Sequence, residues 1–243
     1  MNHIDSEKLK IEQIKSRGNR LLRTVDVDRC IRQNRVEPCV IVYFLKKALG
    51  LLGATECLIE KGYEEEAQVI TRAIIELRIN FQYFLTAGED DWKQVTVRVL
   101  DSVVIEKIKA LKAVDYDFGG EPIDKEHWTV IEEDIKKRYT TEEYNAIRKH
   151  GFSGLSLEER ARRTKNEDWY DSAYRLFSRN VHMADVFETL GASLAPHSFP
   201  DYERSRVDSV WAASVNSSEV IVSGCCAWFA EHDLEAGDKE STS

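Results

Sequence analysis

The residues of this chain that could carry chemistry gather in the segment from Trp169 to Leu190, which we interpret as one helix. A helix turns about 100° per residue, so positions three, four and seven apart share a face. One face is apolar, whereas the opposite face carries an imidazole, guanidiniums, a hydroxyl and carboxylates. An ordinary solvated face is rich in Lys and Glu, so this composition is typical of a site. The polar face consists of Asp171, Arg175, Ser178, His182 and Asp185, with Arg179 at its edge.

An arginine and a histidine on one helical face can serve phosphoryl transfer. The guanidinium of Arg175 would bind a phosphate through two hydrogen bonds and stabilise the charge of the transition state. The imidazole of His182 would move a proton near neutral pH, and neither step needs a metal ion. The same spacing also arises by chance, and a histidine beside Ser or Asp is often a structural hydrogen-bonding residue. Both interpretations stay open.

A second predicted helix, residues 64–86, holds a charged pair in apolar surroundings. Arg72 and Glu76 lie one turn apart, with apolar residues on both sides of the helix. An unpaired buried charge is costly, so the two must pair with each other or with a neighbour. They form either a buried ion pair that fixes helix register, or a pair that faces the 169–190 helix and orients Arg175 or His182. The apolar positions are Ala67, Ile70, Ile74, Leu77, Phe81 and Phe84, with Val69, Ile75 and Ile79 opposite.

Both helices fit an all-α fold. Apolar residues recur with helical periodicity, no segment alternates as a strand would, and the chain has only 4 Pro and 12 Gly among 243 residues. Long helices are predicted at 38–61, 64–86, 90–114 and 202–232, with Gly62 and Gly88 ending the first two. A first helix begins near Asp5 and either ends near Arg17 or continues past Gly18 to Gln33. We expect a single-domain bundle of about seven to eight mostly antiparallel helices over residues 1–234, then a disordered polar tail, 235–243.

The charge of the chain is uneven. A net charge of −9 argues against a protein whose whole surface binds nucleic acid. Residues 136–182 differ, because they contain 11 Lys and Arg against 7 Asp and Glu. We expect RNA or a nucleotide, if the protein binds one, at this segment; the alternative is a solvated region without a ligand.

The five cysteines show no metal-ligand spacing and are interpreted as reduced core thiols. We expect no metal site and no cofactor. The first residues lack the apolar region of a signal peptide, and the apolar stretch at 220–230 is too short to span a bilayer. The sequence therefore predicts a cytoplasmic protein without membrane association.

Two families resemble this chain. Arg175 and His182 resemble the arginine, four-to-six-residue, histidine motif of HEPN domains, which are all-α bundles of bacterial and archaeal defence and toxin systems. The chain looks more like a bacterial all-helical family known only as a domain of unknown function. In that family a helix with Arg-x-x-x-Glu and a following Asn and Tyr precedes a region ending in Tyr-x-x-x-Ser-x-x-x-His. The resemblance covers about residues 40–190 and rests on Arg72, Glu76, Asn80, Tyr83, Tyr174, Ser178 and His182, with Gly154-Leu-Ser156 and Glu159-Arg160-Ala161 between them.

The HEPN resemblance implies a homodimer whose two Arg–His helices form one metal-independent ribonuclease site. A polar residue follows the arginine in that motif, whereas Leu176 follows Arg175 here. We therefore favour a non-catalytic binding or interaction module of a bacterial defence or stress system. The alternative is a HEPN-like ribonuclease or toxin with Arg175 and His182 as its catalytic residues. In both cases the pocket or orienting residues would be Arg72, Glu76, Asn80, Tyr83, Asp171, Tyr174, Ser178 and Arg179.

Overall fold

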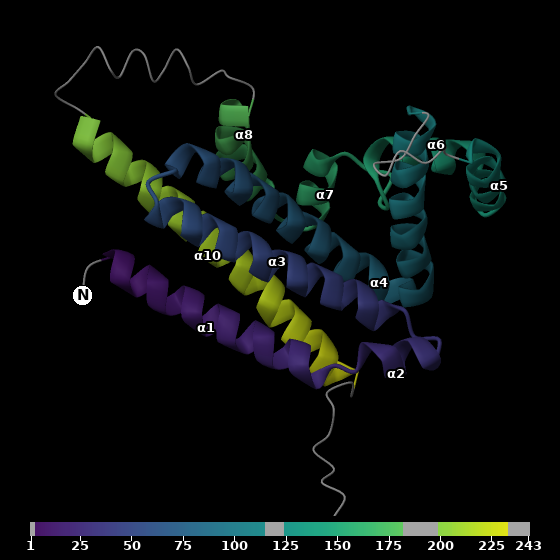
Figure 1. Cartoon of the computed structure of the whole chain (residues 1–243), viewed down its shortest axis with the longest axis horizontal. Coiled ribbons are helices and arrows are strands. Elements are labelled where there is room, and N and C mark those ends of the chain that lie inside the picture. Colours follow the sequence, from purple (N-terminus) through teal and green to yellow (C-terminus); the bar gives the residue numbers. More distant parts are fainter. Residues whose placement is uncertain (1–2, 115–123, 182–198, 233–243) are drawn as a thin grey trace, which may run out of the picture. The chain divides into compact units, whose positions relative to one another are not determined.

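The computed structural model describes residues 3–114, 124–181 and 199–232, and all regular structure in these ranges is helical (Figure 1). The predicted all-α fold class is confirmed. The described ranges contain ten helical segments, against about seven to eight expected. The predicted first and 169–190 helices are each divided, whereas the predicted helices 64–86 and 90–114 form one element. The contacts form two compact units, residues 1–82 with 165–243 and residues 83–164. The single domain over 1–234 stays a prediction, and the tail at 235–243 lies outside the described residues.

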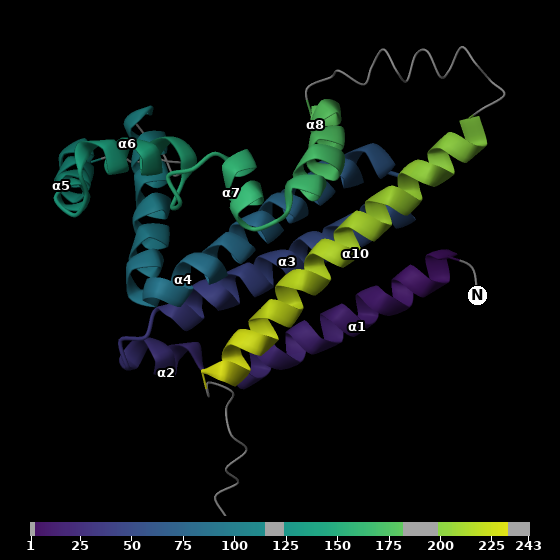
Figure 2. The same ribbon diagram turned by 180° about the vertical axis from the view of Figure 1, so that it is seen from behind.

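Three long helices dominate the first unit: α1 (His3–Thr24), α3 (Glu37–Glu60) and α10 (Phe199–Glu231). Figures 1 and 2 show them side by side, with α3 running opposite to α1 and α10, and α10 packs against both of the others. α1 runs through Gly18, where an added Cβ would lie 2.9 Å from a methyl group of Leu49. Glycine there allows α1 and α3 to approach closely. The fully buried side chains of these three helices include Ile11, Ile41, Leu45, Leu52, Trp211 and Phe229.

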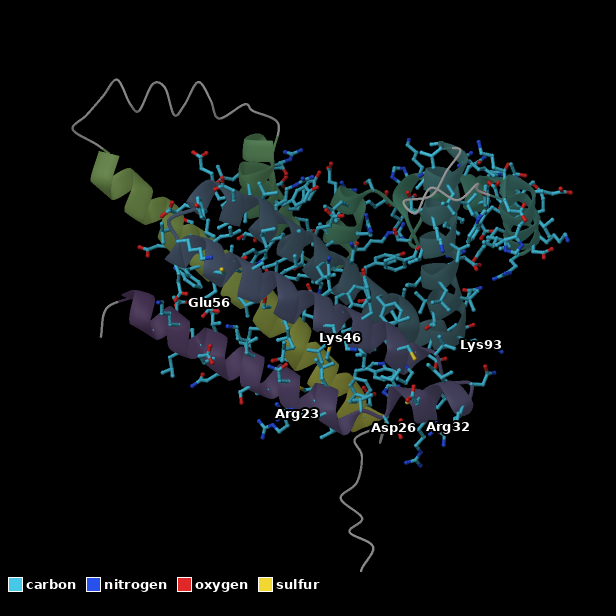
Figure 3. All side chains as sticks on the ribbon, in the orientation of Figure 1. Arg23, Asp26, Arg32, Lys46, Glu56 and Lys93 are labelled. Carbon is cyan, nitrogen blue, oxygen red and sulfur yellow. The ribbon has the colours of Figure 1, made fainter. Side chains whose placement is uncertain are left out.

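The predicted first helix divides before Gln33, because a new helix, α2 (Val27–Arg32), begins after Asp26. The Asp26 carboxylate accepts a hydrogen bond from the backbone N–H of Arg29 at 2.8 Å, which satisfies one of the free donors of a helix start. Figure 3 shows Asp26 at this boundary, with Arg23 and Arg32 pointing away from the helices on either side.

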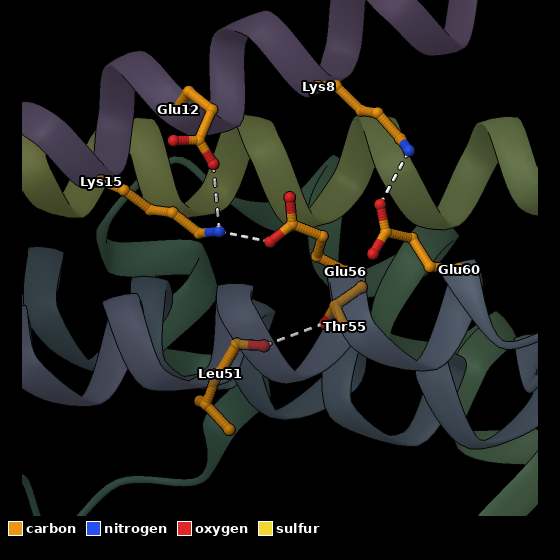
Figure 4. A network of polar contacts seen from close by, with 7 residues as sticks. All are labelled: Lys8, Glu12, Lys15, Leu51, Thr55, Glu56 and Glu60. Carbon is orange, nitrogen blue, oxygen red and sulfur yellow. Dashed lines mark hydrogen bonds and ion pairs between the residues drawn. The ribbon is translucent and has the colours of Figure 1, made fainter.

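α3 is long and apolar enough to cross a membrane by length and composition. The candidate span is therefore this helix and not the shorter apolar stretch at 220–230. Half of the most apolar stretch of α3 is buried within the structure (50%), and charged residues tie its carboxyl end to α1. Figure 4 shows the two ion pairs: Lys15 with Glu56, and Lys8 with Glu60 at 2.7 Å. These contacts favour a core helix of a soluble bundle; a cytoplasmic location stays a prediction.

α4 (Glu64–Lys112) joins the predicted helices 64–86 and 90–114 into one element with a break at Asp91, whose φ is −156° and ψ is 93°. The prediction that Gly88 ends the first helix was wrong. The helix continues through Gly88. Glycine is needed there because a Cβ at this position would lie 2.2 Å from the ring of Trp92. The break follows at Asp91, whose carboxylate accepts from the N–H of Gln94 at 2.9 Å and so caps the second part of the helix.

The second unit consists of the later part of α4 with α5 (Lys125–Lys136), α6 (Thr141–His150) and α7 (Leu157–Arg163). Figure 2 shows α5 and α6 near the end of α4. Burial raises the pKa of the Glu132 carboxyl, but hydrogen bonds from Lys112 and Tyr144, both 2.5 Å long, outweigh it and hold this pKa below its ordinary value. The core between these helices contains Ile105, Ile108, Ile135, Tyr144 and Ile147.

Candidate functional site

The predicted 169–190 helix begins at Trp169, but its first six residues form a π-helix, η1 (Trp169–Tyr174). α8 (Arg175–Val181) continues it. The part of the prediction from His182 onward lies outside the described residues. A π-helix is rare in proteins and is found mostly as a single turn, often at functional sites.

Two tyrosines and one arginine of this segment form a stacked cluster with one arginine of α4. The rings of Tyr170 and Tyr174 lie nearly parallel, at 15°, with centroids 5.2 Å apart. The guanidinium carbon of Arg72, from α4, lies 4.9 Å from the Tyr174 centroid, and that of Arg175 lies 5.5 Å from the Tyr170 centroid. Each ring therefore has an arginine in cation–π contact. We call these four residues the tyrosine–arginine cluster.

Hydrogen bonds and charge hold the cluster in place. Arg72 Nη2 donates to the Tyr174 hydroxyl oxygen at 2.9 Å, while Arg72 Nε is buried without a partner in the described part of the chain. Arg175 Nη1 lies 3.3 Å from a carboxylate oxygen of Asp171, and both side chains are about 60% exposed (60% and 63%). The Ser178 hydroxyl donates to the backbone carbonyl of Tyr174 at 2.6 Å. Arg72 is thus anchored on the inner side of the cluster, whereas Arg175 stays open to solvent.

A third arginine, Arg78, lies beside the cluster and was not predicted as a site residue. It is 8% exposed, and its guanidinium carbon lies 4.5 Å from the ring centroid of Trp169. Its Nη1 donates to the side-chain oxygen of Asn216 on α10 at 2.9 Å. Burial lowers the pKa of this guanidinium, but an arginine in a protein stays charged. Within the described residues its partners are neutral, so its positive charge is not cancelled locally.

A buried hydrogen bond fixes α4 against α10 close to Arg72 in sequence. The hydroxyls of Thr71 and Ser214 lie 2.8 Å apart, and both residues are fully buried. Thr71 also donates to the backbone carbonyl of Ala67 at 2.8 Å. A hydroxyl has one proton, so Ser214 must be the donor of the bond between the two hydroxyls.

The structure brings together some of the predicted site residues. Arg72 meets Tyr174, and Arg175 meets Asp171, as described above. Glu76 is half-buried but makes no hydrogen bond or ion pair with any described residue, including Arg72. Of the two predicted alternatives, the pair between Arg72 and Glu76 is therefore not formed among these residues, and Arg72 pairs with a neighbour, Tyr174. Asn80 is half-buried on the same helix.

Other predicted residues lie elsewhere or cannot be placed. Tyr83 belongs to the second unit, where its ring contacts that of Phe152 at a centroid distance of 5.9 Å. The side chain of Arg179 and the whole of His182 lie outside the described residues. The catalytic and orienting roles assigned to all these residues remain predictions.

The sequence contains a signal for Arg78 in its apolar neighbours. Arg78 stands between Ile74, Ile75 and Ile79, all of which are fully buried. A charged residue among buried β-branched residues on one helix is expected to be buried too, and a buried charge is expected to have a role. Nothing in the helical pattern indicates Asn216 or the stacking on Trp169, because both contacts bring together distant parts of the sequence.

Together these features define an all-α protein with a cationic and aromatic site between α4 and η1. Residues 39–191 match the Family of unknown function (DUF5677), and the chain belongs to this family. No curated protein and no solved structure matches the chain. The resemblance to a family of unknown function is confirmed at this level, while the HEPN link, the motif and a bacterial origin stay predictions.

Proposed function

We propose that this protein is a binding module and that the tyrosine–arginine cluster binds single-stranded RNA. The observation behind the proposal is the parallel pair of tyrosine rings with an arginine over each ring. Aromatic side chains stack on unpaired bases, and guanidiniums bind phosphates through several hydrogen bonds. Because Arg175 is exposed, a base takes its place over the Tyr170 ring while its guanidinium turns to a phosphate. Arg175 contacts Asp171 only as an ion pair at 3.3 Å, so its N–H donors are available to a phosphate.

The proposal predicts a particular pattern of affinities. Replacing Tyr170 by Ala should raise the Kd for a short fluorescein-labelled single-stranded RNA roughly 5- to 100-fold, the value of one base stack. Arg175→Ala should also weaken binding and should reduce the slope of log K against log salt by about 0.7, because one phosphate contact is lost. Fluorescence anisotropy at several salt concentrations measures both quantities.

The matched control is Arg23→Ala, which removes one exposed arginine from the last turn of α1 in the same unit. It should leave the Kd and the salt slope unchanged. If Arg23→Ala weakens binding as much as Arg175→Ala does, attraction is non-specific and the cluster is not the site. If the wild-type protein does not bind RNA at all, the proposal is wrong.

A second candidate function is a HEPN-like ribonuclease, and the exposure of Arg175 favours it, since a catalytic arginine must reach the phosphate. In this proposal two Arg175–His182 helices of a homodimer form one site, and the imidazole of His182 moves the proton of the ribose 2′-hydroxyl. Cleavage should proceed in EDTA and leave cyclic phosphate ends, and His182→Ala should abolish it while RNA binding persists. Binding without cleavage by the wild-type protein would leave only the binding module.

A further inference from the structure

The second unit contains a cavity of about 290 Å³ at the break in α4. Its wall combines aromatic and charged residues from α4, from α7 and from the turn before α7. The aromatic side is formed by Tyr83 and Phe152, whose rings meet edge to face. The polar side is formed by Asp91, Gln94, Arg98 and Arg163. This volume lies at the lower end of the range for small-molecule sites, so it suits a compact ligand.

The two arginines of this cavity keep donors available. Arg98 Nη2 pairs with Glu143 at 3.0 Å, and Arg163 Nη2 pairs with Glu159 at 3.0 Å. A guanidinium has five N–H donors, so each retains several after one such bond. Arg98 Nε is buried and has no partner among the described residues, and a buried donor of this kind is stabilised when an acceptor reaches it.

Positive charge continues beyond this cavity. A neighbouring cavity of about 300 Å³ shares Asp91, Gln94 and Arg98 with it and is also lined by Lys93 and Arg138. Residues 136–164 contain 8 Lys and Arg against 4 Asp and Glu, so the whole excess of positive charge in the basic segment 136–182 belongs to the second unit. The second unit as a whole is slightly acidic, with 14 Lys and Arg against 17 Asp and Glu. The walls of the two cavities differ from it, because Lys93, Arg98, Arg138 and Arg163 face only two carboxylates, Asp91 and Glu143, and this local excess of positive charge favours an anion.

We propose that this cavity binds a mononucleotide, with the base against Tyr83 and Phe152 and the phosphate at Arg98 and Arg163. A flat ring fits beside the aromatic wall, and a phosphate accepts bidentate hydrogen bonds from guanidiniums. Gln94 supplies an amide that can both donate to and accept from a base or ribose. This site is independent of the tyrosine–arginine cluster, which belongs to the other unit, and it takes a small ligand instead of a polymer.

A change at Asp91 tests whether the ligand of this cavity is an anion. Its carboxylate lines the cavity and also caps the second part of α4. Asn caps helices as well as Asp does, so Asp91→Asn should keep the fold and remove one negative charge. Affinity for a nucleotide phosphate should then increase a few-fold. A loss of affinity would mean that the ligand is not held as an anion at this place.

The decisive experiment is isothermal titration calorimetry of the full chain with AMP, GMP, CMP and UMP, and with adenosine and inorganic phosphate as partial ligands. At least one nucleotide should bind, and the partial ligands should bind at least tenfold more weakly because each lacks one half of the recognition. Arg163→Gln should weaken nucleotide binding about tenfold or more, the loss of one charged contact.

The neighbouring arginine provides a close control. Arg162 and Arg163 are both exposed (62% and 55%), and each pairs with a glutamate four residues earlier, but only Arg163 lines the cavity. Arg162→Gln should leave nucleotide affinity unchanged. Equal losses for Arg162→Gln and Arg163→Gln, or no binding of any of the four nucleotides, would overturn the proposal. Arg163→Gln should not change RNA binding at the tyrosine–arginine cluster, so the two proposals can fail separately.

Discussion

The hydrogen bond from Arg72 to the Tyr174 hydroxyl should make a measurable contribution to stability, and Tyr174→Phe removes it while keeping the ring. This bond is the only one that Arg72 makes with the described residues, and its Nε is already without a partner. A hydrogen bond to a charged group contributes about 1.5–3 kcal/mol. We expect Tyr174→Phe to lower the free energy of unfolding by about 2 kcal/mol, which for a chain of this length lowers Tm by about 4–8 °C.

The stacked partner supplies the control. The hydroxyl of Tyr170 makes no hydrogen bond with a described residue, so Tyr170→Phe removes the same atom from the same ring pair without breaking a bond. Its effect should stay within about 0.5 kcal/mol. Thermal unfolding followed by circular dichroism at 222 nm (a wavelength typical of helices) would measure both variants.

A double-mutant cycle measures the energy of this hydrogen bond directly. In an Arg72→Met background the bond is already absent, so adding Tyr174→Phe should change stability by less than about 0.5 kcal/mol. Equal Tm shifts for Tyr174→Phe and Tyr170→Phe would show that the hydroxyl contributes through solvation alone. A full Tyr174→Phe effect without Arg72 would show that another group accepts or donates the bond.

Two further predictions concern buried polar groups. Thr71→Val leaves the Ser214 hydroxyl without its acceptor and should lower the free energy of unfolding by about 1–3 kcal/mol, whereas adding Ser214→Ala should restore part of the loss, as measured by urea unfolding. Burial raises the pKa of Glu132, but its hydrogen bonds outweigh this effect, so the pKa in the folded protein lies below the ordinary value of about 4.5. The ionised carboxylate therefore stabilises the folded protein above about pH 4.5, and this stabilisation is lost as the pH falls through the lower folded pKa. Glu132→Gln should therefore flatten the decrease of Tm between about pH 6 and pH 3; an unchanged decrease would assign acid unfolding to other carboxyls.

The helical fold could be predicted because its signals are local. Helical periodicity and end residues depend on neighbours in sequence. Gly62, which was predicted to end a helix, adopts a positive φ of 76° just after the end of α3. Ser156 likewise caps α7 by accepting from the N–H of Glu159 at 3.2 Å. The prediction of a helix end at Gly88 was wrong because glycine can also lie inside a helix. Here it leaves room for the ring of Trp92, which would lie 2.2 Å from a Cβ.

The site was predictable only in part. Helical periodicity indicates which residues share a face of one helix, but it does not indicate which residues of another helix they contact. The sequence indicated that Arg72 needs a partner, either Glu76 or a neighbour, and in the structure the partner is the neighbour Tyr174. The division of α4 between two units could not be predicted, since it depends on which distant segments pack against each half of the helix. Tyr83 was grouped with Arg72 for this reason, although the two lie in different units.

The π-helix explains two contacts of this segment that helical periodicity does not predict. At about 100° per residue, Trp169 and Tyr174 would lie about 140° apart, and both could not face the same neighbour. In a π-helix the hydrogen bonds join residues five apart, which brings the fifth residue back toward the same face. Trp169 and Tyr174 accordingly both reach α4, through Arg78 and Arg72. The wider turn thus holds the two tyrosine rings against α4, where Arg72 contacts Tyr174. For this reason we expect the ligand to contact the tyrosine rings as well as Arg175.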